Sequence, residues 1–236
     1  MALARASLTF PSAYAQMLIN IAEVYDLPVE LLLQRYGLVL PEGWETRPDV
    51  FIDGEQFAAM LGGLEEFIAQ GGPSAQAKVL EFFPLTIHGY VGLAAMTAAT
   101  LQQALDVGVT YFHQVMPAYD TGYHLDGERC VFSAEPISDF GEHNALLAET
   151  TVCAMNSVLA FSELGFEDVT VTFQHDHLVM TELATFYPGI VIETGSAHNT
   201  VSFPAAALTT PLLTGNAATF RMMENELARR ERFLAT

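Results

Sequence analysis

Three neighbouring residues offer the best case for metal chemistry in this sequence. His175 and His177 flank Asp176, and on an extended strand the two imidazoles would lie on the same side. A zinc or iron site takes a third and usually a fourth protein ligand at a characteristic spacing, and no such ligand is apparent in the sequence. The pattern therefore favours polar residues at the end of a strand, and we expect no metal ligands.

Nucleophilic catalysis has no better support. The sequence contains no Gly-x-Ser-x-Gly motif, and Cys130 and Cys153 stand in apolar stretches without the cations that would stabilise a thiolate. Paired carboxylates such as Glu65 and Glu66 indicate a solvated helix face in a chain with 28 acidic residues. We expect no catalytic residues and no cofactor. Two isolated cysteines without a secretory signal are typical of reduced, buried thiols in a cytoplasmic protein.

The run from Phe82 to Leu105 contains no Asp, Glu, Lys or Arg. A membrane span needs about 20 mostly apolar residues, whereas this run is interrupted by proline, glycine, glutamine and threonine, so we expect no membrane association. Gly89 and Gly92 give only Gly-x-x-Gly, without the third glycine or the lysine of phosphate-binding loops. The run is therefore expected to lie in the protein interior.

A helix should begin within this run. Thr100 is a suitable N-cap for a helix that starts at Leu101, and one face of that helix is apolar. Gly89, Gly92 and the alanines between them and Thr100 allow close packing. Small residues of this kind are found both in a tight core and in a wall that leaves room for a bound molecule, and the residue pattern alone does not choose between these.

The remaining elements predict an α+β fold in which a helical N-terminal section packs on a small mixed β-sheet with covering helices. Helical patterns fill about residues 1–83, and a mixed α/β part follows over about 84–215. A hairpin is expected around Asp126-Gly127, a helix of about six turns should end at Gly165, and a C-terminal helix occupies 216–236. Residues 88 to 113 are expected to be buried between the helical section and the sheet.

The charge distribution limits the partners of this chain. The formal net charge is -19, with 28 acidic residues against nine Lys and Arg. Such a surface repels phosphate backbones and anionic lipids, so the chain as given is not expected to bind DNA. Four of the eight arginines lie in the last 16 residues, where they indicate either a solvated helix end or a junction to a further segment.

Several segments together resemble a known family. The matching segments, in chain order, are His88-Gly89-Tyr90-Val91-Gly92-Leu93-Ala94, Thr100-Leu101-Gln102-Gln103-Ala104-Leu105, Tyr111, Val171 to His175, Tyr187 to Ile192, Asn199, and Phe203-Pro204-Ala205. Their order and spacing are similar to those of AraC/XylS-type transcriptional regulators, in the branch with an N-terminal arabinose-binding-like sensor domain. The resemblance covers nearly the whole chain.

The resemblance implies an effector-sensing and dimerisation domain over 1-215 that forms a homodimer. It also implies that 216-236 leads to a helix-turn-helix DNA-binding domain absent from this chain, so that DNA is bound only through that domain. The chain would then be either a truncated regulator or a lone sensor. The alternatives are a stand-alone small-molecule-binding protein and a small-molecule enzyme without a recognised motif.

For the sensor interpretation, the uncharged run and the helices that face it supply the candidate ligand-binding residues. These are His88, Tyr90, Met96, Tyr111, Phe112, His113, Met155 and Phe173. Apolar walls with a few Tyr and His groups are typical of small-molecule cavities. No Lys or Arg lies in these segments, which disfavours a sugar phosphate. We therefore expect a mainly apolar effector, such as a fatty acid or other lipophilic metabolite.

Overall fold

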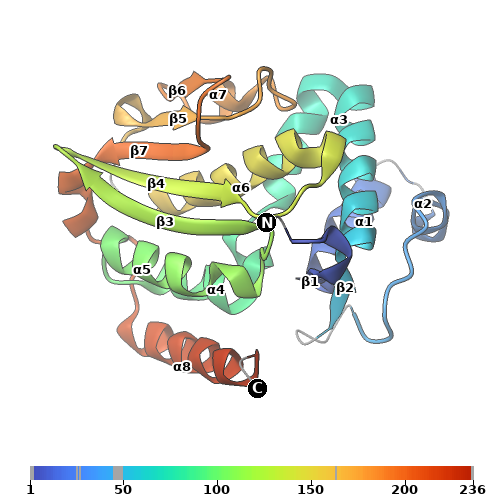
Figure 1. Cartoon of the computed structure of the whole chain (residues 1–236), viewed down its shortest axis with the longest axis horizontal. Helices are drawn as coiled ribbons and strands as arrows, with labels where there is room; N and C mark the ends of the chain where they lie inside the picture. The colour runs from blue at the N-terminus through green and yellow to red at the C-terminus, as the bar shows by residue number, and fades with distance from the viewer. Residues whose placement is uncertain (1–2, 25, 27, 45–49, 163, 235–236) are drawn as a thin grey trace.

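The computed structural model describes residues 3–24, 26, 28–44, 50–162 and 164–234, and they form an α+β fold, as predicted (Figure 1). The helices are α1 (Gln16–Val24), α2 (Val29–Arg35), α3 (Gly54–Phe82), α4 (Gly89–Thr97), α5 (Leu101–Tyr111), α6 (Asn144–Leu159), α7 (Leu183–Phe186) and α8 (Ala217–Leu234). The strands are β1 (Thr9–Pro11), β2 (Phe51–Asp53), β3 (Tyr119–Asp126), β4 (Arg129–Pro136), β5 (Thr170–Thr172), β6 (Val191–Glu193) and β7 (Thr200–Pro204).

The N-terminal section contains α1 to α3 and a small sheet that the sequence did not predict. β1 pairs antiparallel with β2, and Phe10 lies opposite Ile52 with both side chains buried. Three-residue strands are too short to show an alternating pattern, so only the helices were recognised. α3 begins where the Asp53 side chain accepts the backbone N–H of Gln56, and it bends at Gly72, whose φ is +56°. The backbone of Gly72 is not helical, so α3 consists of two helices joined at a kink.

The larger sheet has the strand order β3-β4-β7-β5-β6, with β5 and β6 parallel and the other pairs antiparallel. It is the mixed sheet expected from the sequence. In the β3–β4 hairpin Asp126 pairs with Arg129, so the turn residues are Gly127 and Glu128, one position later than predicted. The positive φ of Gly127, +57°, explains the glycine in this turn. Alternate β4 residues are buried, which marks the face that the helices cover.

α6 is the central helix of this cover. It begins near the predicted position, but it ends at Leu159 and not at Gly165. The hydroxyl of Ser162 donates to the Leu159 carbonyl oxygen and accepts the N–H of Leu164, which closes the helix early. Thirteen of its sixteen residues are buried, so α6 is a core helix.

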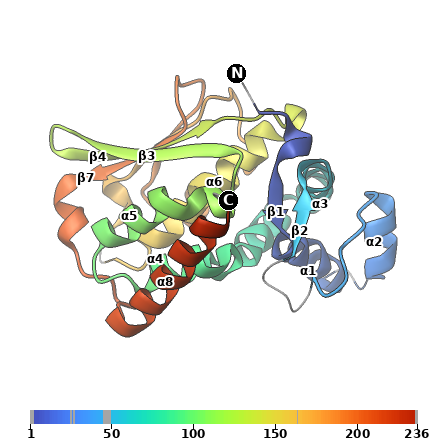
Figure 2. The same cartoon turned by 60° about the horizontal axis from the view of Figure 1, so that its bottom comes forward.

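α4 and α5 lie beneath β3 and β4, and α8 packs along the far side of α4 (Figures 1 and 2). The expected position between the N-terminal section and the sheet was therefore wrong in part, because α3 packs to the side, against α6. The Thr100 side chain accepts the backbone N–H of Gln103, which confirms the predicted cap of α5. A Cβ at Gly92 would lie 1.7 Å from the Leu85 carbonyl oxygen, so only glycine fits there.

Among the residues described, no single helix is long and apolar enough to span a membrane. Gly54–Glu81 and Leu85–Thr97 meet the criteria of length and composition only as a pair, and the two helices of that pair are bent by 55°.

Candidate functional site

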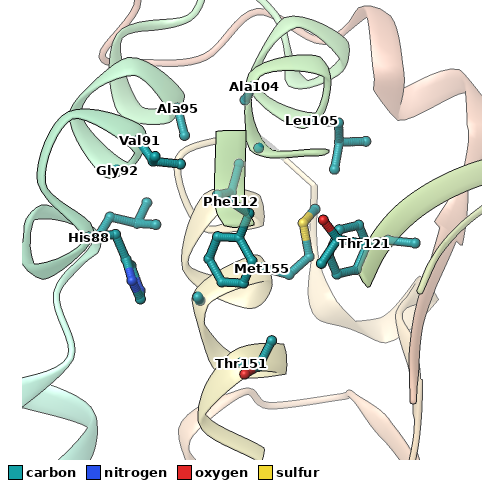
Figure 3. A pocket seen from close by; sticks show the side chains of 15 residues that line it. His88, Val91, Gly92, Ala95, Ala104, Leu105, Phe112, Thr121, Thr151 and Met155 are labelled. Carbon is teal, nitrogen blue, oxygen red and sulfur yellow. The ribbon is translucent and has the colours of Figure 1, made fainter. Parts of the chain in front are cut away.

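A small cavity lies between α4, α5, α6 and the first two strands of the larger sheet. Its volume is about 50 Å³. The residues around it are Leu85, His88, Val91, Gly92, Ala95, Ala104, Leu105, Gly108, Phe112, Thr121, Phe132, Thr151, Ala154, Met155 and Val158. Figure 3 shows the His88 ring on one side of the cavity, Met155 on the other, and the Phe112 ring between them.

His88 supplies the main polar group of this cavity. Its side chain is buried, and Nδ1 lies 2.7 Å from the hydroxyl oxygen of Tyr14. Its other ring nitrogen, Nε2, is buried and has no hydrogen-bond partner among the described residues. Burial lowers the pKa of His88 to about 4, because the imidazolium ion would lose its hydration. The ring is therefore neutral at physiological pH.

The other polar side chains around the cavity are those of Thr121 and Thr151. The Thr151 hydroxyl donates to the Leu147 carbonyl oxygen at 2.7 Å, so its proton is already engaged within α6. None of the lining residues carries a formal charge at neutral pH. The cavity can thus accommodate apolar surface together with one or two uncharged polar atoms, and it has no group that would neutralise an ion.

The size of the cavity limits what it holds in this conformation. Binding sites for drug-sized molecules occupy about 300–1,000 Å³, whereas a water molecule needs roughly 10–15 Å³ of such space. At about 50 Å³ the cavity is too small for a metabolite of ordinary size. A larger guest would require a wall to move, and α4 contributes mostly small residues to that wall.

The structure brings three of the eight predicted ligand-binding residues to this cavity: His88, Phe112 and Met155. Two others face α8. The Arg230 guanidinium carbon lies 4.5 Å from the ring centroid of Tyr90, and Nε2 of His113 lies 3.0 Å from Glu231 Oε2. Tyr90 and His113 therefore connect the segment around the cavity to the C-terminal helix.

The remaining three predicted residues lie apart from the cavity. Met96 lines a surface depression next to Phe161, and Tyr111 packs against the core. Phe173 is fully buried, with its ring centroid 4.9 Å from that of His175. Whether any of the eight contacts an effector stays a prediction.

Sequence reasoning missed several residues that belong to the cavity and its surroundings. Thr121 and Phe132 come from neighbouring strands, and their inward direction depends on the hairpin register. Tyr14 is 74 positions from the histidine that it binds. The helical period places Gly108 and Leu105 on the apolar face of α5 with Phe112, although neither was among the predicted ligand-binding residues.

A second hollow, an open groove of about 490 Å³, lies at the start of β3, where Tyr119 lines it two residues before Thr121 of the cavity wall. Its walls include Tyr119, Asn144, Gln174, His175 and Asn199. Next to it the fully buried carboxylate of Glu149 accepts the N–H groups of Val179 and Met180, and Oε1 lies 3.0 Å from His175 Nε2. Both oxygens of this carboxylate therefore accept hydrogen bonds.

The segment from Gln174 to His177 is a bend and not the extended strand that the metal hypothesis required. Within the described residues, no three His, Cys, Asp or Glu side chains are grouped so that they could hold a metal ion. Both cysteines are buried and free, and burial raises the pKa of Cys130 to about 11 and that of Cys153 further, so the thiolate forms are disfavoured at neutral pH.

Comparisons with known proteins complement this geometry. A family model described as the arabinose-binding domain of AraC transcription regulator, N-terminal, matches residues 27–212. The ornithine utilization regulator of Pseudomonas aeruginosa is 23% identical over 237 aligned positions, which cover 96% of this chain and 65% of that protein. The crystal structure of the transcriptional regulator CdpR from the same organism has a similar fold, with a TM-score of 0.59 and 16% identity over 89% of this chain and 61% of that one. This chain thus spans less than two thirds of each relative.

Proposed function

Since this chain belongs to the family of N-terminal arabinose-binding domains of AraC transcription regulators, and is thus a regulatory ligand-binding domain, we propose that it senses a small, mainly apolar effector. We further propose that effector binding controls an attached DNA-binding domain. The effector class follows from the cavity, whose wall is formed by aliphatic, aromatic and glycine residues and only three polar side chains. A fatty acid or other lipophilic metabolite has the required apolar surface.

One observation carries the proposal: α4 separates the cavity from α8. Val91, Gly92 and Ala95 of α4 face the cavity, whereas Tyr90 contacts Arg230 of α8. An effector larger than the present cavity would displace α4, because protein interiors have little free space to compress. The displacement would alter the contacts of α8, the helix that continues towards the C-terminus.

The partners expected from the resemblance belong to the same proposal. They are a second copy of this chain in a homodimer, and DNA bound only through a domain outside these residues. The net charge of -19 supports the absence of DNA binding by this part. Two buried, free thiols are typical of proteins in a reducing compartment such as the cytoplasm.

The test is a search for a retained compound, followed by a measurement at α8. Native mass spectrometry of protein purified without added ligand should show a bound lipophilic molecule of unchanged mass. Readdition of that molecule to stripped protein should change amide hydrogen exchange in α4 and α8. Chemical conversion of the molecule would instead indicate an enzyme.

A matched pair of variants tests the location. Ala95→Leu fills the cavity and should abolish retention of the compound, whereas Ala99→Leu, at an exposed position just after α4, should leave retention unchanged. Equal retention by both variants would contradict binding in this cavity.

A further inference from the structure

We propose that the effector is recognised through an uncharged hydrogen-bond acceptor, a carbonyl or ether oxygen, that receives the Nε2–H of His88, with Tyr14 as the positioning residue. This inference rests on the proposed function and narrows its ligand class. It favours an apolar molecule with an internal carbonyl or ether oxygen over one that brings a free carboxylate or an ammonium group into the cavity.

The Tyr14 hydroxyl determines which histidine nitrogen carries the proton. Among the described residues its hydrogen-bond partner is His88 Nδ1, and its side chain is fully buried. If Nδ1–H donated to the hydroxyl oxygen, the Tyr14 O–H would be a buried donor without an acceptor, which costs about 1–3 kcal/mol. When Tyr14 donates to Nδ1, both groups are satisfied and the proton of the neutral ring lies on Nε2.

That proton has no acceptor within the protein. Five buried side-chain atoms lack a hydrogen-bond partner among the described residues, and His88 Nε2 is the one that belongs to the cavity wall. A buried water usually makes about three hydrogen bonds. With the Thr151 proton engaged at Leu147, the wall offers a water few partners, so an acceptor on an apolar guest fits this donor better.

The same wall disfavours charged guests. It contains no Asp, Glu, Lys or Arg, and burial keeps His88 neutral. An anion or a cation in the cavity would lose its hydration without gaining a counter-charge. A ketone, ester or ether oxygen needs only one donor, and His88 provides it.

The tautomer can be measured without any ligand. Long-range ¹H–¹⁵N spectra of the 236-residue protein should show His88 with protonated Nε2 and unprotonated Nδ1. Protonation at Nδ1 instead would overturn the inference, because Nε2 would then be an acceptor. Tyr14→Phe should shift His88 towards a mixture of tautomers, whereas Tyr119→Phe, at a buried tyrosine that lines the groove, should not.

Ligand chemistry is tested with cyclopentanone, cyclopentane and cyclopentylamine, which share one ring and differ in the polar group. Affinities are measured by ligand-observed NMR for the wild type and for the double variant Tyr14→Phe/His88→Phe, which replaces both hydrogen-bonding partners with rings of similar shape. The preference for the ketone over the hydrocarbon should fall about ten-fold in the double variant. The amine should bind more weakly than the ketone to the wild type.

The outcomes separate the two proposals. An unchanged ratio of ketone to hydrocarbon affinity, or an amine that binds as well as the ketone, would overturn this inference alone. If no probe binds and no compound is retained after purification, the proposed function fails together with it. If the double variant does not fold, the inference is still tested by two measurements on the wild-type protein. These are the tautomer of His88 and the relative affinity for ketone and amine.

Discussion

The cavity and the groove each adjoin a hydrogen-bonded histidine, but they differ in how their polar groups are satisfied. At the groove, Glu149 receives two backbone N–H groups and the His175 imidazole. At the cavity, His88 has one partner and leaves Nε2 free. The groove is the larger hollow, about 490 Å³ against about 50 Å³. The comparison teaches that an unsatisfied polar atom in a cavity wall distinguishes a candidate binding site better than volume does, because satisfied groups mainly stabilise the fold.

The largest effect is expected at Glu149, because its buried carboxylate accepts three hydrogen bonds. Glu149→Leu removes the acceptor of three donors and should lower the free energy of unfolding by about 3–5 kcal/mol. Glu149→Gln, which keeps one acceptor oxygen, should cost less. Urea denaturation measures both. If Glu149→Leu lowered the free energy of unfolding by less than about 1 kcal/mol, the polar groups at the groove would not be mainly structural, and the contrast with the cavity would fail.

Acid should destabilise the folded protein, because His88 is buried and resists protonation. Above pH 6.5 this ring is neutral in both the folded and the unfolded chain; as the pH falls towards 4, only the unfolded chain binds the proton. The free energy of unfolding should therefore fall between pH 6.5 and 4 by roughly 3 kcal/mol, at about 1.4 kcal/mol per pKa unit. His88→Gln, which can still accept from Tyr14, should lose less stability over this interval. If the free energy of unfolding fell equally with pH in the wild type and in His88→Gln, the lowered pKa of His88 would be contradicted.

Two glycines of the cavity wall provide the next contrast. Gly92→Ala brings a Cβ against the Leu85 carbonyl oxygen and should destabilise the protein by about 1–3 kcal/mol or more, through a forced backbone shift. Thermal unfolding followed by circular dichroism would show the lower midpoint. A wild-type midpoint would mean that α4 moves easily.

The smallest expected effect has the opposite sign. A Cβ at Gly108 meets no atom within 4 Å, so Gly108→Ala should raise the free energy of unfolding by about 0.5–1 kcal/mol, because alanine favours the helix. The methyl group also occupies the cavity, so cyclopentanone should bind more weakly. A variant that is more stable and binds equally well would show that the guest lies elsewhere.

Local signals predicted most of the secondary structure. The Thr100 cap, the hairpin around Asp126-Gly127 and the C-terminal helix depend on neighbouring residues and were correct. The errors arose where distant contacts decide. β1 and β2 are short segments about 40 positions apart that pair with each other, and α6 ends early because Ser162 folds back on Leu159.

By itself, the absence of charge in the run from Phe82 to Leu105 indicated that this run contributes to the interior, and the sequence showed that the chain resembles a regulatory sensor. It did not determine which side chains of this run face a cavity. An amphipathic helix marks its inner face by contrast with a polar one, but α4 has no charged residue on any side, since it is covered by the cavity region on one side and by α8 on the other. Only the tertiary structure directed Val91 and Ala95 inward and Tyr90 towards Arg230, and only it brought Tyr14 to His88.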